Sequence, residues 1–177
     1  MLLFAYAISQ GGAVKFEQVA AALFAGIAIA HSFASFLRMD AAGIARPYLL
    51  LPFILSFSCD SGAYLAGRAF GRHKLAPVVS PHKTVEGAVG GLLGNLIGGL
   101  VFAFLNGGGP DYLRMIMLSL ICGVISQLGD LSFSLIKRQY GIKDYGRVFL
   151  AHGGVLDRFD SVLFVTPVVE FALFRFA

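Results

Sequence analysis

Five long apolar stretches dominate this sequence and constrain its fold more than any other feature. A helix needs about 20 mostly apolar residues to cross the hydrocarbon core of a bilayer. The stretches that meet or approach this length are 16–37, 48–70, 85–105, 112–136 and 154–176. Only 14% of the residues are charged, whereas soluble globular domains average about 25%. The sequence therefore predicts an all-α, polytopic transmembrane helix bundle with about five spans, formed by one domain over residues 1–177.

The segments outside these stretches carry less information. MLLFAYAIS, at the start, is too short to span a membrane and lacks the basic start and cleavage site of a signal peptide. We interpret it as the end of an earlier membrane segment. Cys59 and Cys122 lie in apolar stretches without metal-ligand spacing, so we expect them to be inert packing residues.

Two loops, residues 71–84 and 137–153, are polar and basic, and with five spans both emerge on the same side of the membrane. That side carries nine lysines and arginines against four on the other, with Arg158 left out as part of a span. The positive-inside bias therefore places both loops in the cytoplasm. Topology and an anionic lipid surface then account for much of the net charge of +4, and no nucleic acid is needed as a partner.

The third apolar stretch is rich in glycine. Gly87 and Gly91 are four residues apart, and Gly90, Gly94 and Gly98 form a second series with the same spacing. Small residues at this spacing let two helix backbones approach closely in lipid. We therefore expect helix packing from this stretch, including a homodimer contact through it, and no chemistry.

Four aspartates lie within the predicted spans or on their first turns, where a charge in the bilayer costs at least about 2.5 kcal/mol. They are Asp60, Asp130, Asp157 and Asp160. Helical spacing places Asp130 on one face with Ser134, Lys137 and Arg138, and Asp157 on one face with Asp160. Charged side chains in a membrane usually face a wet cavity or a partner.

A purely structural explanation covers part of this pattern. The aspartates that begin the last span would complement the helix dipole by about 0.3–1 kcal/mol each. The two cations at the end of the fourth span would anchor it at the interface. Neither effect helps Asp60 or Asp130, which lie deeper. A cation site beside a polyanion site explains the whole set better, and Mg²⁺ fits because it shares carboxylate oxygens with phosphate and water.

The loops supply groups that suit phosphate. Thr84 can cap the third span, and Lys83 beside that helix start would suit a phosphate, because backbone N–H groups point outward there. Ser80 precedes them in the same loop. The glycines of HGG, residues 152–154, permit a close backbone approach to a ligand.

Residues 134–160, SLIKRQYGIKDYGRVFLAHGGVLDRFD, resemble the signature of phosphatidate cytidylyltransferases, the CDP-diacylglycerol synthases. That signature runs S-x-x-K-R, four residues, K-D, and then H-G-G-x-x-D-R-x-D. The positions in register are Ser134, Lys137, Arg138, Lys143, Asp144, His152, Gly153, Gly154, Asp157, Arg158 and Asp160. Residues 59–87 resemble the upstream motif of the same family, so the resemblance extends over most of the chain.

Three departures from the family pattern stand out. Leu150 and Ala151 occupy the place of the usual Pro-Gly, and Phe57 stands where a tryptophan is common. Family members usually carry further spans before the first one seen here. A truncated copy, a fragment and a naturally short form therefore remain open, and so does activity of the chain by itself.

The resemblance implies transfer of a cytidylyl group from CTP to phosphatidate, giving CDP-diacylglycerol and pyrophosphate in phospholipid biosynthesis. The protein would be integral to a bacterial inner membrane. The lipid phosphate is already an anion near neutral pH, so no strong general base is required. The barrier is repulsion between anions, which metals and cations counter. The expected cofactor is Mg²⁺, alone or with a second cation, and the expected partners are CTP, phosphatidate and anionic lipid.

The resemblance also assigns residues to roles. The expected metal ligands are Asp130, Asp157, Asp160 and Asp60, and the expected catalytic residues are Asp130, Asp157, Lys137 and Arg138. Substrate binding is expected from Lys83, Ser80, Ser134, Lys143, His152 and Arg158. Arg158 either holds a phosphate or orients an aspartate, and His152 either contacts phosphate or stabilises its loop. No pattern that would recognise cytosine is apparent.

Three other functions compete with this interpretation. A CTP-dependent lipid-alcohol kinase, of the dolichol or phytol kinase type, would share the nucleotide but transfer the γ-phosphate. A transporter with an intramembrane carboxylate relay would explain Asp60 and Asp130 but not the basic loops. A truncated, non-catalytic homologue would explain the short chain but not the complete set of charged motif residues.

Overall fold

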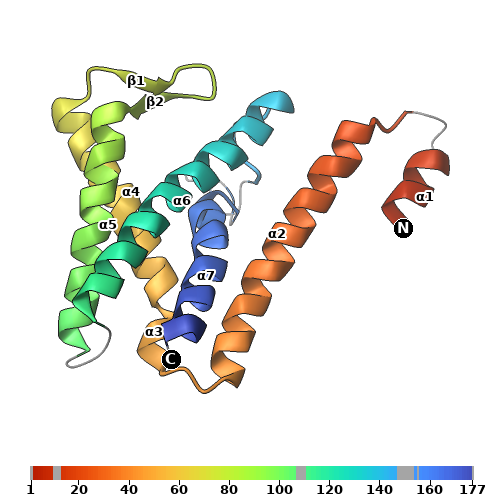
Figure 1. The fold of residues 1–177 in the computed structure, drawn as a ribbon. Coiled ribbons are helices and arrows are strands. Elements are labelled where there is room, and N and C mark those ends of the chain that lie inside the picture. The colour runs from red at the N-terminus through yellow and green to blue at the C-terminus, as the bar shows by residue number, and fades with distance from the viewer. Residues whose placement is uncertain (1, 10–12, 107–110, 147–153, 155, 177) are drawn as a thin grey trace.

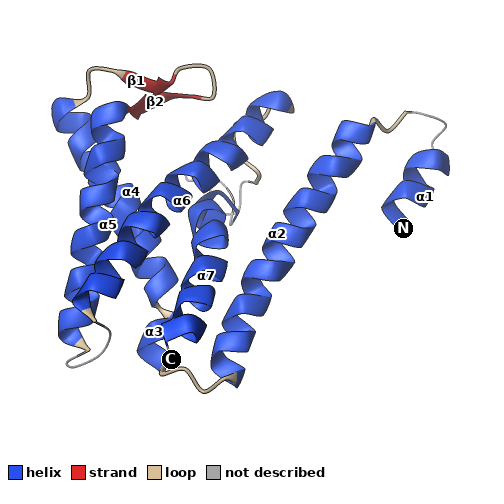
Figure 2. Ribbon diagram, in the orientation of Figure 1, coloured by secondary structure: helices blue, strands red, loops and turns tan. Residues whose placement is uncertain are grey.

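The computed structural model describes residues 2–9, 13–106, 111–146, 154 and 156–176. Across these residues the chain is a bundle of helices with one short hairpin at one end (Figures 1 and 2). The helices are α1 (Leu2–Ser9), α2 (Phe16–Ala41), α3 (Arg46–Leu49), α4 (Leu51–Phe70), α5 (Val85–Leu105), α6 (Tyr112–Gln139) and α7 (Leu156–Phe176). The strands are β1 (Lys74–Ala76) and β2 (Ser80–Thr84).

The expectation of an all-α membrane bundle is confirmed. Within the described part of the chain, three helices are long and apolar enough to cross a membrane, namely α2, α5 and α6. Helices α4 and α7, with 20 and 21 residues, have the length to span but carry more polar residues. A spanning role for α4 and α7, and with it the count of five spans, stays a prediction.

The helices α4 to α7 pack into the body of the bundle, and α2 lies at its edge against α7 (Figure 1). The core joins all four of these helices, with Leu55 from α4, Phe102 from α5, Cys122 from α6 and Val165 from α7 all buried. The bundle therefore holds together mainly through apolar contacts among these four helices.

The glycine series of α5 packs against α4 in the same chain. A Cβ atom on Gly62 of α4 would lie 3.0 Å from the Cα atom of Gly94 and would collide with the carbonyl oxygen of Gly90. The expectation that these glycines serve helix packing is therefore confirmed. Because α4 covers this face of α5, a homodimer through α5 would need another face of the helix, and that contact stays a prediction.

The basic segment 71–84, expected to be a loop, contains the antiparallel hairpin β1–β2, with Lys74 paired to Thr84 and Ala76 to Ser80. The carboxylate of Glu86, in the first turn of α5, accepts a hydrogen bond from Arg72 N at 3.0 Å. It also contacts His73 Nδ1 at 2.6 Å. These contacts fasten the hairpin over the ends of α4 and α5.

An ion pair joins α2 to α7 at the opposite end of the bundle, near α3. Arg38 Nη2 lies 2.7 Å from Glu170 Oε2, and Arg38 Nε donates to the other carboxylate oxygen. Nη2 also lies 3.0 Å from Ser35 Oγ, and Glu170 is buried. This guanidinium and carboxylate therefore satisfy each other within the protein.

Candidate functional site

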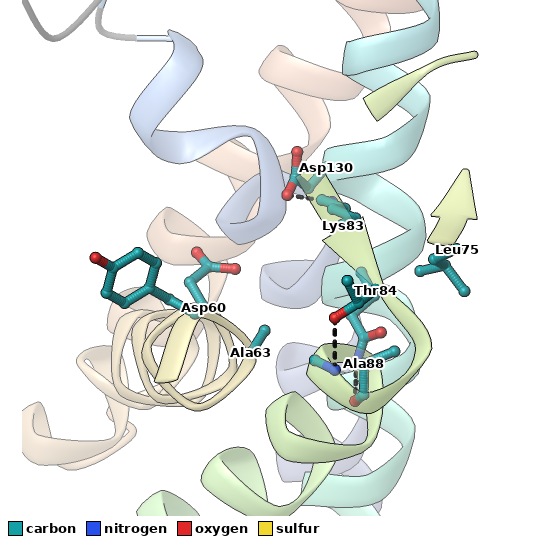
Figure 3. A pocket seen from close by; sticks show the side chains of 10 residues that line it. Asp60, Ala63, Leu75, Lys83, Thr84, Ala88 and Asp130 are labelled. Atoms are coloured by element: carbon teal, nitrogen blue, oxygen red, sulfur yellow. Dashed lines mark hydrogen bonds and ion pairs between the residues drawn. The ribbon is translucent and has the colours of Figure 1, made fainter. Parts of the chain in front are cut away.

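Two adjoining cavities lie at the hairpin end of the bundle. The first, here the acidic cavity, has a volume of about 290 Å³ and is lined by Asp60, Asp130, Asp157, Arg158 and Asp160, among others. The second, here the hairpin cavity, has a volume of about 230 Å³ and includes Tyr64, Leu75, Lys83, Ala88 and Gln127. Asp60 and Asp130 line both cavities, and Figure 3 shows them in the hairpin cavity. The structure thus brings together all four aspartates that the sequence singled out, from α4, α6 and α7.

Asp130 stands between the two cavities and contacts β2. Lys83, at the end of the hairpin, forms an ion pair with Asp130 Oδ2 (Figure 3). Ser134, one turn further along α6, donates a hydrogen bond to Asp130 Oδ1 at 3.3 Å. The helical face predicted from the spacing of Asp130 and Ser134 is therefore present, and Lys83 adds a cation from a distant part of the chain.

Asp157 is held by three donors. Its Oδ1 accepts from Lys137 Nζ at 2.8 Å, and its Oδ2 accepts from the backbone N–H groups of Tyr145 and Gly154, both at 2.9 Å. The side chains of Lys137 and Asp157 are only 11% and 8% exposed. Asp157 therefore joins the end of α6 to the start of α7, and a metal ligand at this position would have to exchange one of these contacts.

Asp60 and Asp160 interact with Ser161. Asp160 Oδ1 accepts from Ser161 N at 2.7 Å, and Asp60 Oδ2 accepts from Ser161 Oγ at 3.4 Å. Electrostatic repulsion acts between Asp130 and each of these two carboxylates, and between the two themselves. Carboxylates that repel one another across a shared cavity favour a cation beside them.

The groups around the acidic cavity that could bind a metal ion are carboxylate oxygens, the ligand type that Mg²⁺ prefers. Among the described residues, no three histidine, cysteine, aspartate or glutamate side chains lie close enough to hold a metal ion by themselves. Mg²⁺ usually binds through one or two carboxylates and takes the rest of its shell from water and substrate phosphate. The residues present fit such a shared site, and the magnesium site stays a prediction.

Tyr145 contributes to this site, although the sequence interpretation did not single it out. Its hydroxyl donates to Phe133 O at 3.0 Å, and Lys137 Nζ lies 5.4 Å from its ring centroid. Burial and the nearby negative charges of Asp157 and Asp160 raise the pKa of the Tyr145 phenol to about 12. The phenol therefore stays protonated near neutral pH and keeps its hydrogen bond. An aromatic residue inside the 134–160 motif was the only signal in the sequence.

Gly154 of the HGG motif makes a close backbone contact, as expected, but with the protein. A Cβ atom here would lie 2.9 Å from Gly146 N and 3.3 Å from Asp157 Oδ2. Glycine at this position therefore lets Gly154 lie close to Gly146 beside the Asp157 carboxylate. His152 and Gly153 lie outside the described residues.

Arg138 points away from both cavities, although its spacing placed it on the face of Asp130. Its Nε donates to Val79 O at 3.2 Å and its Nη1 to Ile142 O at 3.3 Å. Arg138 therefore braces the hairpin against the end of α6. Lys143 is exposed in the following loop and Ser80 is half-buried at the start of β2. Phosphate binding by these three residues stays a prediction.

Two further features concern the start of α5. Thr84 Oγ1 accepts from Gly87 N at 3.1 Å, which confirms the predicted helix cap. Gln127, which lines the hairpin cavity, donates from Nε2 to Ala88 O at 3.0 Å. The sequence interpretation missed Gln127, and its position three residues before Asp130 in an apolar span was the available signal.

Known proteins are similar to this chain over its whole length. The sequence profile of the cytidylyltransferase family matches residues 1–176. The phosphatidate cytidylyltransferase of Bacillus subtilis (strain 168) is 36% identical over 181 residues, which cover 100% of this chain and 66% of that protein. The enzymes of the same name from Staphylococcus saprophyticus and Staphylococcus haemolyticus are 43% and 41% identical over 128 residues, or 72% of this chain and 49% of each relative. The chain therefore spans between about half and two thirds of the length of these relatives.

Proposed function

The chain belongs to the cytidylyltransferase family, and from that premise we propose that it transfers a cytidylyl group from CTP to phosphatidate. An oxygen of the lipid phosphate forms a bond to the α-phosphorus of CTP, and the bond from that phosphorus to the β-phosphate oxygen breaks. The products are CDP-diacylglycerol and pyrophosphate. We propose further that the protein lies in a bacterial inner membrane with the hairpin end on the cytoplasmic side.

One observation carries the proposal. Aspartates from three helices converge on a cavity at the end of a membrane bundle, next to two lysines that are already paired with them. A site that must bring two phosphate groups together needs cations for the phosphates and anions to bind a metal. The acidic cavity offers carboxylates and Arg158 in its lining, and the two lysines contact its aspartates.

The ion pairs suggest how substrates enter without leaving buried charges unpaired. Lys83 and Lys137 can pass from Asp130 and Asp157 to phosphate oxygens, and the freed carboxylates can then hold a cation. Each exchange replaces one charge-assisted contact by another. When bound, Mg²⁺ would supply positive charge for the transferring phosphate and the leaving pyrophosphate.

A labelling experiment distinguishes this reaction from its rivals. The whole 177-residue chain, in lipid nanodiscs with phosphatidate and Mg²⁺, is given CTP labelled at either the α- or the γ-phosphate. We expect label in the extracted lipid from α-labelled CTP only. Label from the γ-phosphate would instead show a lipid kinase. No label from either, in an assay where the longer Bacillus subtilis enzyme is active, would show that this chain is not catalytic by itself.

An Asp157→Asn variant tests the site directly. We expect formation of CDP-diacylglycerol to fall to background while the chain still inserts into membranes, because the amide cannot hold Lys137 as an ion pair or bind a cation as a carboxylate does. Turnover equal to that of the unchanged chain would remove the proposed role of Asp157.

A further inference from the structure

We infer that the hairpin cavity binds the cytosine ring of CTP and that the Gln127 carbonyl oxygen distinguishes cytosine from uracil. This inference rests on the proposed function, since it concerns which nucleotide the reaction uses. Gln127 belongs to none of the motif positions that carry the family resemblance.

The position of the hairpin cavity suits a base. Asp60 and Asp130 line both it and the acidic cavity, so a ligand in one cavity adjoins a ligand in the other. A nucleotide whose phosphates lie among the charges of the acidic cavity can therefore extend its base into the hairpin cavity, where Figure 3 shows Lys83 and Asp130.

The size and walls of the hairpin cavity also suit a single ring. Cavities for drug-sized ligands measure about 300–1,000 Å³, so a volume of about 230 Å³ is better matched to a pyrimidine than to a whole nucleotide. Its walls include Ala63, Tyr64, Leu75 and Ala88. Apolar side chains of this kind can contact a planar heterocycle, and an aromatic ring can stack on it.

The direction of the Gln127 carboxamide is set by its neighbours. Ala88 O is an acceptor only, so the atom that lies 3.0 Å from it must be the Gln127 amide nitrogen. The same nitrogen also approaches Cys59 Sγ at 3.8 Å. None of the hydrogen bonds found among the described residues uses Gln127 Oε1, which leaves this oxygen as an acceptor for a ligand in the cavity.

A hydrogen-bond acceptor held in one orientation can discriminate between cytosine and uracil. Cytosine carries an amino group at C4, which donates hydrogen bonds, whereas uracil carries a carbonyl oxygen at the same place. Gln127 Oε1 can accept from the amine of cytosine and would face an unfavourable oxygen in uracil. Because Nε2 is held by Ala88, the carboxamide cannot rotate to offer its donor instead without losing that bond.

Nucleotide analogues test the inference without altering the fold. Initial rates are measured for the 177-residue chain in nanodiscs with CTP, with UTP, and with zebularine triphosphate, whose ring is cytosine without the amine. We expect kcat/KM for CTP to exceed that for zebularine triphosphate about five- to tenfold, as for one neutral hydrogen bond. UTP should be used less well than either, because it leaves two acceptors facing each other.

A Gln127→Leu variant completes the test. It should raise KM for CTP about five- to tenfold, leave KM for phosphatidate unchanged, and bring the ratio of CTP to zebularine triphosphate close to one. Asn95→Leu is the matched control, since Asn95 is fully buried between α5 and α6 and lines neither cavity. This control should keep the nucleotide ratio even if it changes stability.

Each result separates the inference from the function on which it rests. Equal use of CTP and zebularine triphosphate by the unchanged chain, or a ratio that Gln127→Leu leaves intact, overturns the inference while cytidylyl transfer stands. A variant that changes only KM for phosphatidate also overturns it, since the hairpin cavity would then hold the lipid headgroup. If the unchanged chain makes no lipid product from CTP, the proposed function fails first and the inference with it.

Discussion

The two ends of the bundle both contain buried or half-buried ion pairs, but the surroundings of these pairs differ. Near α3, Arg38 and Glu170 form a two-point pair with each other. At the hairpin end, Lys83 and Lys137 each pair with an aspartate, and two more carboxylates share the cavity. A matched pair holds two helices together, whereas carboxylates that repel one another are retained at a cost in stability. A cost of this kind is common at binding sites, which supports the proposed role of the hairpin end.

The largest difference between the ends should appear in turnover. We expect Asp130→Asn to lower the rate of CDP-diacylglycerol formation at least about 100-fold, because charge stabilisation at a reacting phosphate is lost. The isosteric change Glu170→Gln should stay within about threefold of the unchanged chain, since Glu170 is remote from both cavities. Initial rates in nanodiscs measure both. Similar losses in the two variants would show that the ends do not differ in function.

Stability should separate Asp157 from Asp130 at the same end. Asp157→Asn leaves the buried Lys137 without its ion pair, and we expect the free energy of unfolding to fall by about 2–4 kcal/mol. Asp130→Asn should change it by less than about 1 kcal/mol, because lost pairing with Lys83 is offset by relief of repulsion from Asp60 and Asp160. Denaturant unfolding in detergent measures both changes. The double variant Lys137→Met with Asp157→Asn should recover part of the stability but not the activity, because the asparagine oxygen still accepts from the backbone N–H groups that Asp157 holds.

Magnesium should stabilise one end of the bundle only. At a concentration ten times its dissociation constant, a ligand of the folded state adds about 1.4 kcal/mol to stability. We expect Mg²⁺ to raise the melting temperature of the unchanged chain and of Glu170→Gln, and to have no such effect on Asp130→Asn. An equal rise in all three proteins would place the metal away from the acidic cavity.

The smallest effect should come from the Arg38 end. Glu170→Gln keeps the shape of the side chain and one acceptor oxygen for the guanidinium, so its melting temperature should fall less than that of Asp157→Asn. The double variant that exchanges the two charges, Arg38→Glu with Glu170→Arg, can form the ion pair again, so its melting temperature should fall less than that of either single change. If Glu170→Gln proves the more damaging change, the pair at this end carries more of the stability than the pair at the hairpin end.

The helices were largely predictable. The apolar stretch 85–105 coincides with α5, and 16–37 and 112–136 fall inside α2 and α6, which continue for a further four and three residues respectively. Both helices extend past their apolar stretches because polar residues can continue a helix beyond the hydrocarbon core, into the polar interface of the membrane. The hairpin was not predicted, because β1 has only three residues and shows no alternating pattern.

The sequence predicted which aspartates belong to the candidate site, but it did not predict which partner each side chain contacts. The cost of charge in a membrane singled out four aspartates, and all four line one cavity, namely Asp60, Asp130, Asp157 and Asp160. Lys137 and Arg138 looked equivalent in sequence, yet Lys137 points inward to Asp157 and Arg138 outward to Val79. Consecutive residues on a helix lie about 100° apart, so only the placement of the neighbouring helices decides which of the two faces the cavity.

The sequence by itself determined that this is a helical membrane protein and that its acidic residues must share a polar environment. Both conclusions depend on composition and on periodicity within single helices, which are local properties. Tertiary structure alone decided that Lys83 meets Asp130, that two backbone N–H groups converge on Asp157, and that Gln127 lines a cavity. Those contacts join segments far apart in the chain, and they depend on how each helix is rotated and placed against the next.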